Sequence, residues 1–188
     1  MKNKKCCVIG LGYIGLPTSI ISASSGFTVV GVDKNLKIVE DLNKGIIHIE
    51  EPNLDIEFAK IISKKTFKAQ DKPCNSDVFI IAVPTPFKNK LESDPIPDIS
   101  FVLKALESII PYLEKDNLII LESTSPVGTT DQLASKVFKE TSLNPNQIKI
   151  AYCPERVLPG KILKEIIEND RGIGGINEEA ALAAKDFY

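Results

Sequence analysis

The sequence contains few of the residues from which metal sites are built. Among its 188 residues there is one histidine, His48, and none of its four cysteines forms a CxxC pair. A zinc site needs several such ligands at short spacing, so the ligand count and spacing predict no metal site. Cys6 and Cys7 lie in an apolar run, where small reduced thiols pack well, and reduced thiols fit the cytoplasm.

An excess of charge of one sign is also missing. The 23 basic and 25 acidic residues leave a net charge of −2. This near balance gives no sign of the excess positive charge with which proteins bind nucleic acid or an anionic membrane. Three glycines and Pro17 interrupt the apolar N-terminal stretch, which argues against a secretory signal and for a cytoplasmic protein. The length and the 43% hydrophobic content predict one globular domain with a full core.

A glycine-rich turn is the most informative feature that is present. Gly10, Gly12 and Gly15 follow the apolar run 6–9, and Asp33 closes the next apolar run. In a dinucleotide-binding unit the first glycine permits a sharp turn, the second lets the backbone approach a pyrophosphate, and the third lets the helix pack against the strand. The helix that begins there would point free amides and its positive dipole end at the phosphates.

Asp33 bears on the choice of cofactor. A carboxylate at this position would accept hydrogen bonds from the adenosine ribose and would repel the 2′-phosphate of NADP, so the sequence favours NAD. Lys34 follows immediately and would weaken that repulsion. The alternatives are a strand–helix turn with incidental glycines and an Asp33 that is a solvated acid at a strand end.

Apolar runs alternate with helical patterns along the chain. This alternation predicts an α/β fold, a Rossmann-type doubly wound parallel sheet with helices on both faces. We expect Gly45 to end a helix and the polar, proline-rich segment 87–97 to be a mobile loop near the ligand. The expected strands are 6–9, 28–32, 66–69, 77–83, 118–121 and 148–152, with a short strand or turn at 172–175. The expected helices follow the glycine turn and span 35–43, 55–63, 99–113, 129–141, 161–168 and 178–188.

Polar clusters follow three of these strands. Ligands of such sheets bind beyond the carboxyl ends of the strands, which favours a ligand role for Thr85 and Thr124. Ser125 and Thr129 fit a helix-capping role equally well. The clusters are Pro84-Thr85-Pro86, Ser123-Thr124-Ser125 and Pro154-Glu155-Arg156.

Four ordered strings resemble those of the nucleotide-sugar 6-dehydrogenases. Within that family, the strings at 45–54 and 154–160 are most similar to members that oxidise UDP-N-acetyl-D-mannosamine, although UDP-glucose and UDP-N-acetylglucosamine enzymes share the scaffold. Pro159 stands where UDP-glucose enzymes usually carry a second acid, which disfavours UDP-glucose. The four strings cover residues 8–18, 82–86, 122–130 and 153–160.

The resemblance implies an activity and a set of site residues. The family oxidises the C6 alcohol of a UDP-sugar to a carboxylate and reduces two NAD. By resemblance, Gly10, Gly12, Tyr13, Ile14, Gly15 and Asp33 would hold the ADP half of NAD. Thr85 and Thr124 would contact the ribose and the nicotinamide side, with Pro84 beside them. Thr124 and Glu155 are the catalytic candidates, Glu155 as the acid that activates the hydrolytic water. Glu155, Arg156 and Val157 would bind the sugar nucleotide, the alternative being a surface ion pair of Glu155 with Arg156.

The resemblance also implies parts that are not found in these residues. The family nucleophile is a cysteine in a glycine-rich motif and the family base is a lysine, and no such motif occurs here. Cys153 precedes a proline where the family does not place its nucleophile, so it is expected to be a packed thiol. We therefore expect residues 1–188 to be the NAD-binding domain, without the central helix that builds the family's homodimers and without the UDP-sugar domain. Such a domain alone would be compatible with a monomer and would not complete the oxidation. A stand-alone NAD-binding module and a different Rossmann dehydrogenase are the alternatives.

Overall fold

Short apolar runs form the strands of a central sheet. The computed structural model describes residues 4–88 and 95–188. In these ranges the sheet has seven strands in the order β3-β2-β1-β4-β5-β6-β7. The strands are β1 Lys5–Ile9, β2 Thr28–Val32, β3 Phe67–Gln70, β4 Val78–Ile81, β5 Leu118–Leu121, β6 Lys149–Tyr152 and β7 Gly174–Gly175.

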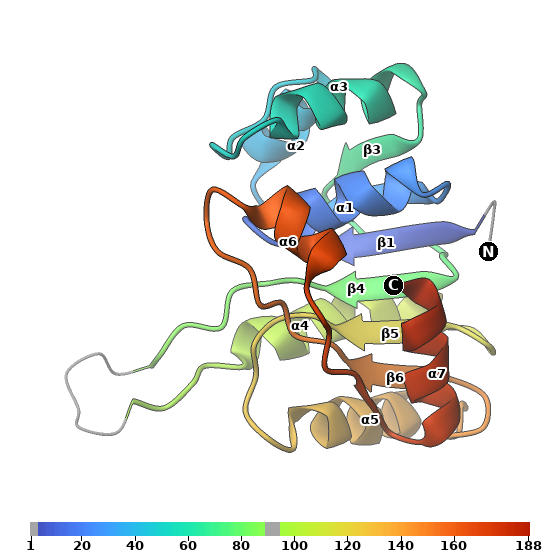
Figure 1. Cartoon of the computed structure of the whole chain (residues 1–188). Coiled ribbons are helices and arrows are strands. Elements are labelled where there is room, and N and C mark those ends of the chain that lie inside the picture. The colour runs from blue at the N-terminus through green and yellow to red at the C-terminus, as the bar shows by residue number, and fades with distance from the viewer. Residues whose placement is uncertain (1–3, 89–94) are drawn as a thin grey trace.

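Helices cover both faces of this sheet. Figure 1 shows α1, α6 and α7 on one side and α4 and α5 on the other. Within the described residues, no helix combines the length and the apolar character needed to cross a membrane. The helices are α1 Gly15–Ser24, α2 Leu36–Asn43, α3 Leu54–Ser63, α4 Ser100–Ile109, α5 Thr129–Glu140, α6 Ile162–Glu168 and α7 Glu178–Phe187.

Alternation along the strands divides the core into two layers. Val8 and Ile80 belong to the layer that packs under α1 and α7, whereas Cys7 and Phe79 belong to the layer under α4 and α5. All four are at most 1% exposed, because successive side chains of a strand point to opposite faces and both faces are covered. The prediction of a doubly wound sheet with helices on both faces is confirmed.

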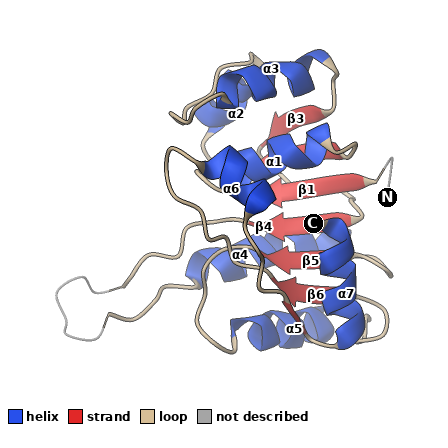
Figure 2. Cartoon of the chain, in the orientation of Figure 1, coloured by secondary structure: helices blue, strands red, loops and turns tan. Residues whose placement is uncertain are grey.

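The strand order places one crevice at the carboxyl edge of the sheet. β1 pairs in parallel with β2 on one side and with β4 on the other, so the chain winds outward from β1 in both directions. The loops that follow β1, β4, β5 and β6 emerge at the same edge, as Figure 2 shows. Ligands of open α/β sheets bind outside such a reversal point.

Four segments are to be compared with the sequence-based expectations. The helix expected over 99–113 ends at Ile109 and continues as a 3₁₀ turn, Ile110–Tyr112, because Pro111 has no amide to donate to the preceding turn. The strand expected over 77–83 is shorter, and β7 pairs antiparallel to β6 rather than extending the parallel order. The expected mobile loop falls partly on residues 89–94, which lie outside the described residues, and its two arms are joined by a bridge between Phe87 and Pro97.

Candidate functional site

Two of the glycines in the first turn are required by close contacts. Gly10 has φ +94°, and a Cβ there would lie 2.7 Å from the carbonyl oxygen of Ala82. A Cβ at Gly15 would lie 1.8 Å from the carbonyl oxygen of Gly10, so any side chain would push α1 away from the turn. Gly12 differs, because a Cβ there would meet nothing within 4 Å. The backbone at Gly12 is therefore open to a ligand, at the amino end of α1.

The carboxylate of Asp33 holds this turn in place. One of its oxygens accepts a hydrogen bond from the amide of Leu11 at 3.0 Å, and the other accepts one from the amide of Asn35 at 2.9 Å. The residue is half-buried rather than fully solvated. Asp33 thus orients the glycine turn and also brings a negative charge to the crevice edge.

A first cavity, which we call the Asp33 cavity, lies beside the turn. It has a volume of about 170 Å³, and Gly10, Asp33 and Pro84 line it. Lys34 and Lys104 also line this cavity. Two cations therefore stand near the position at which Asp33 would meet a ribose, and they would soften its repulsion of a 2′-phosphate.

A second cavity, which we call the Glu155 cavity, is lined by Ile14 of the same turn. It has a volume of about 320 Å³ and includes residues from four strand ends or turns. Val83 and Pro84 line both cavities, so one wall is shared between them. Residues of the Glu155 cavity that the sequence had singled out are Ile14, Pro84, Thr85, Thr124, Glu155 and Val157.

Thr85 and Thr124 are joined directly. The hydroxyl of Thr85 donates to the carbonyl oxygen of Thr124 at 2.7 Å, and the hydroxyl of Ser123 donates to the carbonyl oxygen of Val83 at 2.7 Å. These bonds tie the segment after β4 to the segment after β5. Two of the three predicted polar clusters therefore meet in one wall of the Glu155 cavity.

Ser125 and Thr129 do not cap the helix that follows them, contrary to the helix-capping alternative. The N-cap of α5 is Gly128, and no side chain caps it. The hydroxyl of Ser125 donates to the carbonyl oxygen of Ser123 at 3.0 Å, and that of Thr129 donates to the carbonyl oxygen of Pro126 at 2.7 Å. These two side chains stabilise the turn itself.

The remaining predicted residues line neither cavity. Gly12 and Tyr13 are exposed on the turn, and Gly15 is buried beneath it. Arg156 is exposed, between the two cavity residues Glu155 and Val157. Arg156 stays a prediction.

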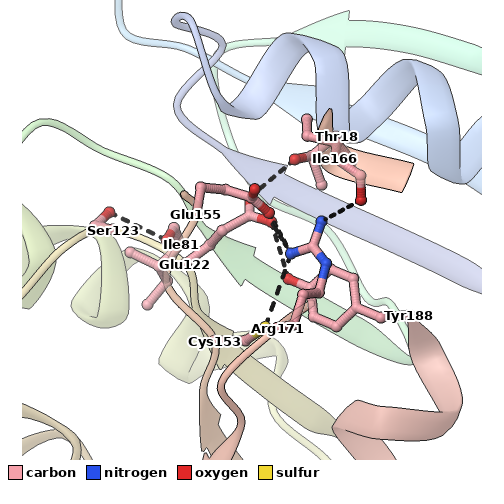
Figure 3. A network of polar contacts seen from close by, with 9 residues as sticks. All are labelled: Thr18, Ile81, Glu122, Ser123, Cys153, Glu155, Ile166, Arg171 and Tyr188. Atoms are coloured by element: carbon pink, nitrogen blue, oxygen red, sulfur yellow. Dashed lines mark hydrogen bonds and ion pairs between the residues drawn. The ribbon is translucent and has the colours of Figure 1, made fainter. Parts of the chain in front are cut away.

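Glu155 forms an ion pair, but with a different arginine from the one that the sequence suggested. Its carboxylate accepts a hydrogen bond from the guanidinium of Arg171, and its side chain is only 6% exposed. Arg171 also donates to the carbonyl oxygen of Ile166 at 3.1 Å and lies 3.9 Å over the ring of Tyr188. Figure 3 shows these groups converging. The surface pair of Glu155 with Arg156 is therefore replaced by a buried pair with Arg171.

Glu122 is a second buried carboxyl in the same cluster, and sequence reasoning missed it. It follows β5 directly, is 1% exposed, and lines the Glu155 cavity. Thr18 donates to one of its oxygens at 3.0 Å and the Tyr188 hydroxyl donates to the other at 2.9 Å (Figure 3). The sequence feature that could have pointed to Glu122 is an acidic residue directly after a continuously apolar strand. Arg171 had no comparable local signal.

The protonation of this cluster differs from that of free side chains. Burial raises the pKa of Glu122 to about 8; the charge of Glu155 and a hydrogen bond with it act in the same direction, while the bonds from Tyr188 and Thr18 oppose it. Burial also raises the pKa of Tyr188 and that of Cys153, which lies 3.8 Å from a guanidinium nitrogen. The phenol and the thiol are therefore neutral at pH 7, and Cys153 is a packed thiol, as predicted.

The loop that carries Glu155 is tied to a distant part of the chain. Glu51, in the connection between α2 and α3, is 9% exposed. Its carboxylate accepts hydrogen bonds from the amides of Gly160 at 2.8 Å and Ile162 at 2.6 Å, at the start of α6. These charge-assisted bonds fix the far end of the loop relative to α1 and α3.

Comparisons with known proteins agree with this geometry. Residues 4–188 match the NAD binding domain of the UDP-glucose/GDP-mannose dehydrogenase family. The chain is 50% identical over 192 residues to a UDP-N-acetyl-D-mannosamine dehydrogenase of Campylobacter jejuni, covering 98% of this chain and 46% of that protein. It is 48% identical to one of Methanocaldococcus jannaschii, covering 99% of this chain and 42% of that protein.

A solved structure is similar over the same extent. The UDP-N-acetyl-mannosamine dehydrogenase of Staphylococcus aureus superposes with a TM-score of 0.92 at 45% identity, covering 97% of this chain and 43% of that one. The chain thus spans less than half the length of these relatives. On its fold, its glycine turn and these matches, the chain belongs to the UDP-glucose/GDP-mannose dehydrogenase family, whose NAD-binding domain its residues 4–188 represent.

Proposed function

We propose that this chain holds NAD across the glycine turn, with the adenosine in the Asp33 cavity and the nicotinamide in the Glu155 cavity. The observation that carries this proposal is the shared wall: Val83 and Pro84 line both cavities, and the glycine turn contributes Gly10 to one cavity and Ile14 to the other. Each half of a dinucleotide would then occupy one cavity. The pyrophosphate would lie at Gly12, where the backbone is open and the free amides of α1 begin.

The chain's own residues would have distinct parts in this complex. Gly10, Tyr13 and Ile14 would surround the phosphates, and the carboxylate of Asp33 would accept hydrogen bonds from the ribose. Pro84, Thr85 and Thr124 would contact the nicotinamide half, where bound NAD supplies the acceptor for a hydride. Gly15, at the buried amino end of α1, would keep the phosphate-binding residues of the turn close to the sheet.

We propose further that the protein oxidises the C6 alcohol of UDP-N-acetyl-D-mannosamine to a carboxylate with two NAD. The support is the identity of 50% and 48% to the two dehydrogenases of that name. Thr124 and Glu155 would be the catalytic residues, with Glu155 activating the hydrolytic water, and Arg156 and Val157 would contact the sugar nucleotide. None of the four cysteines lines the Asp33 or the Glu155 cavity, so we expect residues 1–188 to bind NAD without completing the second oxidation, for which the family uses a cysteine nucleophile.

Calorimetry of the purified chain with NAD, NADP and a panel of UDP-sugars tests this proposal. We expect NAD to bind more tightly than NADP, because Asp33 disfavours a 2′-phosphate. Gly12→Val should abolish NAD binding, since its side chain would project into the open space at the turn. Undiminished NAD binding by Gly12→Val would contradict the placement, and tighter binding of another UDP-sugar than UDP-N-acetyl-D-mannosamine would contradict the substrate.

A further inference from the structure

We propose that Glu122 and Glu155 form an acid pair that holds one proton, and that this pair releases the proton when oxidised NAD binds and not when NADH binds. The inference rests on the proposed placement of the nicotinamide in the Glu155 cavity. It assigns a role to Glu122, which the comparisons do not single out. It also makes the charge of the cavity wall depend on the redox state of the cofactor.

The first step is the geometry of the pair. Glu122 comes from the end of β5 and Glu155 from the loop after β6, and both residues line the Glu155 cavity. Their side chains are 0% and 6% exposed, so water does not screen the charge of either. One guanidinium, that of Arg171, pairs with Glu155 and lies 3.9 Å from the nearer oxygen of Glu122 (Figure 3).

The second step is a count of charges. Two ionised carboxylates and one guanidinium would leave a buried net charge of −1, which is costly in a water-excluded site. One proton held by the pair makes the cluster neutral. Burial and the negative charge of Glu155 place this proton on Glu122, because both raise its pKa.

The other groups that face Glu122 do not supply a compensating charge. Thr18 from α1 donates a neutral hydroxyl, and Tyr188 after α7 donates a neutral phenol. Cys6 from β1 and Cys153 after β6 are thiols whose pKa burial raises, so both are neutral. Arg171 is the one cation among the residues that contact Glu122 in the described part of the chain.

The third step is the effect of the cofactor's charge. The oxidised nicotinamide ring carries a positive charge, whereas the reduced ring is neutral. A cation in the Glu155 cavity would stabilise the doubly ionised pair and so drive the proton off Glu122. The neutral ring would leave the proton in place, because it adds no charge to the cavity.

This coupling balances the charges of alcohol oxidation. As a hydride leaves the alcohol carbon for the nicotinamide, the positive charge of the ring disappears and the alcohol oxygen loses its proton. The aldehyde and NADH are neutral at the reacting atoms, and the ionised pair regains its preference for one proton. Glu122 and Glu155 together can therefore take up the proton that the oxidation liberates.

Calorimetric titration of the chain at pH 7.5, in buffers of different ionisation enthalpy, measures the protons released on binding. We expect more than about half a proton to be released per oxidised NAD bound and close to none per NADH. Glu122→Gln should retain binding of both forms and lose the release. The matched control Glu140→Gln, an exposed carboxyl at the end of α5, should release the same number of protons as the parent chain.

A second measurement on the parent chain does not depend on the folding of a variant. Carbon-detected NMR of glutamate side-chain carboxyls should show one glutamate that titrates near pH 8 without ligand and is ionised at pH 7.5 with oxidised NAD. Binding of oxidised NAD without proton release, or the same release from Glu122→Gln, would refute the acid pair while leaving the proposed NAD site intact. Failure of both cofactors to bind would refute the proposed NAD site and the cofactor-linked proton release with it, whereas the absence of a glutamate that titrates near pH 8 without ligand would refute the acid pair itself.

Discussion

Replacement of Glu122 by glutamine should change how stability depends on pH. The pKa of this carboxyl is 4.5 in its ordinary state and about 8 in the folded chain, where burial is the main cause of the rise. Between these values the folded chain holds a proton that the unfolded chain has lost. The free energy of unfolding therefore falls as pH rises through this window, and the contribution is lost once pH passes the folded pKa.

The size of the effect follows from the shift. Each unit of pH in the window corresponds to about 1.4 kcal/mol, and the slope flattens as the folded group begins to ionise. From pH 6 to pH 8 the parent chain should lose about 2 kcal/mol of unfolding free energy relative to Glu122→Gln. The glutamine side chain is neutral at both pH values and keeps hydrogen-bonding groups toward Thr18 and Tyr188.

Urea unfolding of both proteins at pH 6, 7 and 8 measures this difference directly. All other titratable groups are shared by the two proteins, so their contributions largely cancel in the comparison. Glu140→Gln should follow the parent curve, because that carboxyl is exposed on α5. Parallel curves for Glu122→Gln and the parent would show that Glu122 is ionised when folded, and the reasoning about the buried cluster would fail.

Three further predictions concern the turn and the loop. Asp33→Ala should weaken NAD binding by about 1–3 kcal/mol, or about 5- to 150-fold in Kd, by calorimetry, because a charge-assisted acceptor is lost; an unchanged Kd would place the ribose elsewhere. Gly15→Ala should lower the unfolding free energy by about 1–3 kcal/mol, since a Cβ would lie 1.8 Å from the Gly10 carbonyl oxygen. A urea midpoint equal to that of the parent chain would contradict this contact. Glu51→Gln should cost about 1.5–3 kcal/mol and speed hydrogen exchange at the amides of Gly160 and Ile162, whereas unchanged exchange would mean that the tether is not formed.

Local sequence patterns were sufficient to predict the fold and several of the residues that line the two cavities. The glycine turn, Asp33 and the apolar strands are encoded within short windows, where spacing and burial act on neighbouring residues. The structure placed Thr85 and Thr124 in hydrogen-bonding contact because strand order brings the ends of β4 and β5 together, as a parallel sheet requires. The end of α4 was misjudged because the apolar periodicity continues past Pro111, which interrupts the backbone hydrogen bonds.

The buried cluster could not be predicted in the same way. Glu122 and Tyr188 are 66 residues apart, and Arg171 reaches Glu155 from a loop without regular structure. Their pairing depends on how α7 and the segment before β7 pack onto the sheet, which no local pattern encodes. Arg156, the neighbour of Glu155 in sequence, was the natural candidate for an ion pair, yet the chain turns it to the surface.

The tether between Glu51 and the start of α6 bears on how members of this family could be recombined. A loop from another family member, transplanted between Cys153 and Ile162, would arrive without its own anchor. The amides at positions 160 and 162 would have to reach the Glu51 carboxylate at the same distances, or the buried amide at 162 would be left without a partner. Successful chimaeras should therefore exchange the 46–54 connection and the 154–162 loop as a single cassette, although more than a hundred residues separate them along the chain.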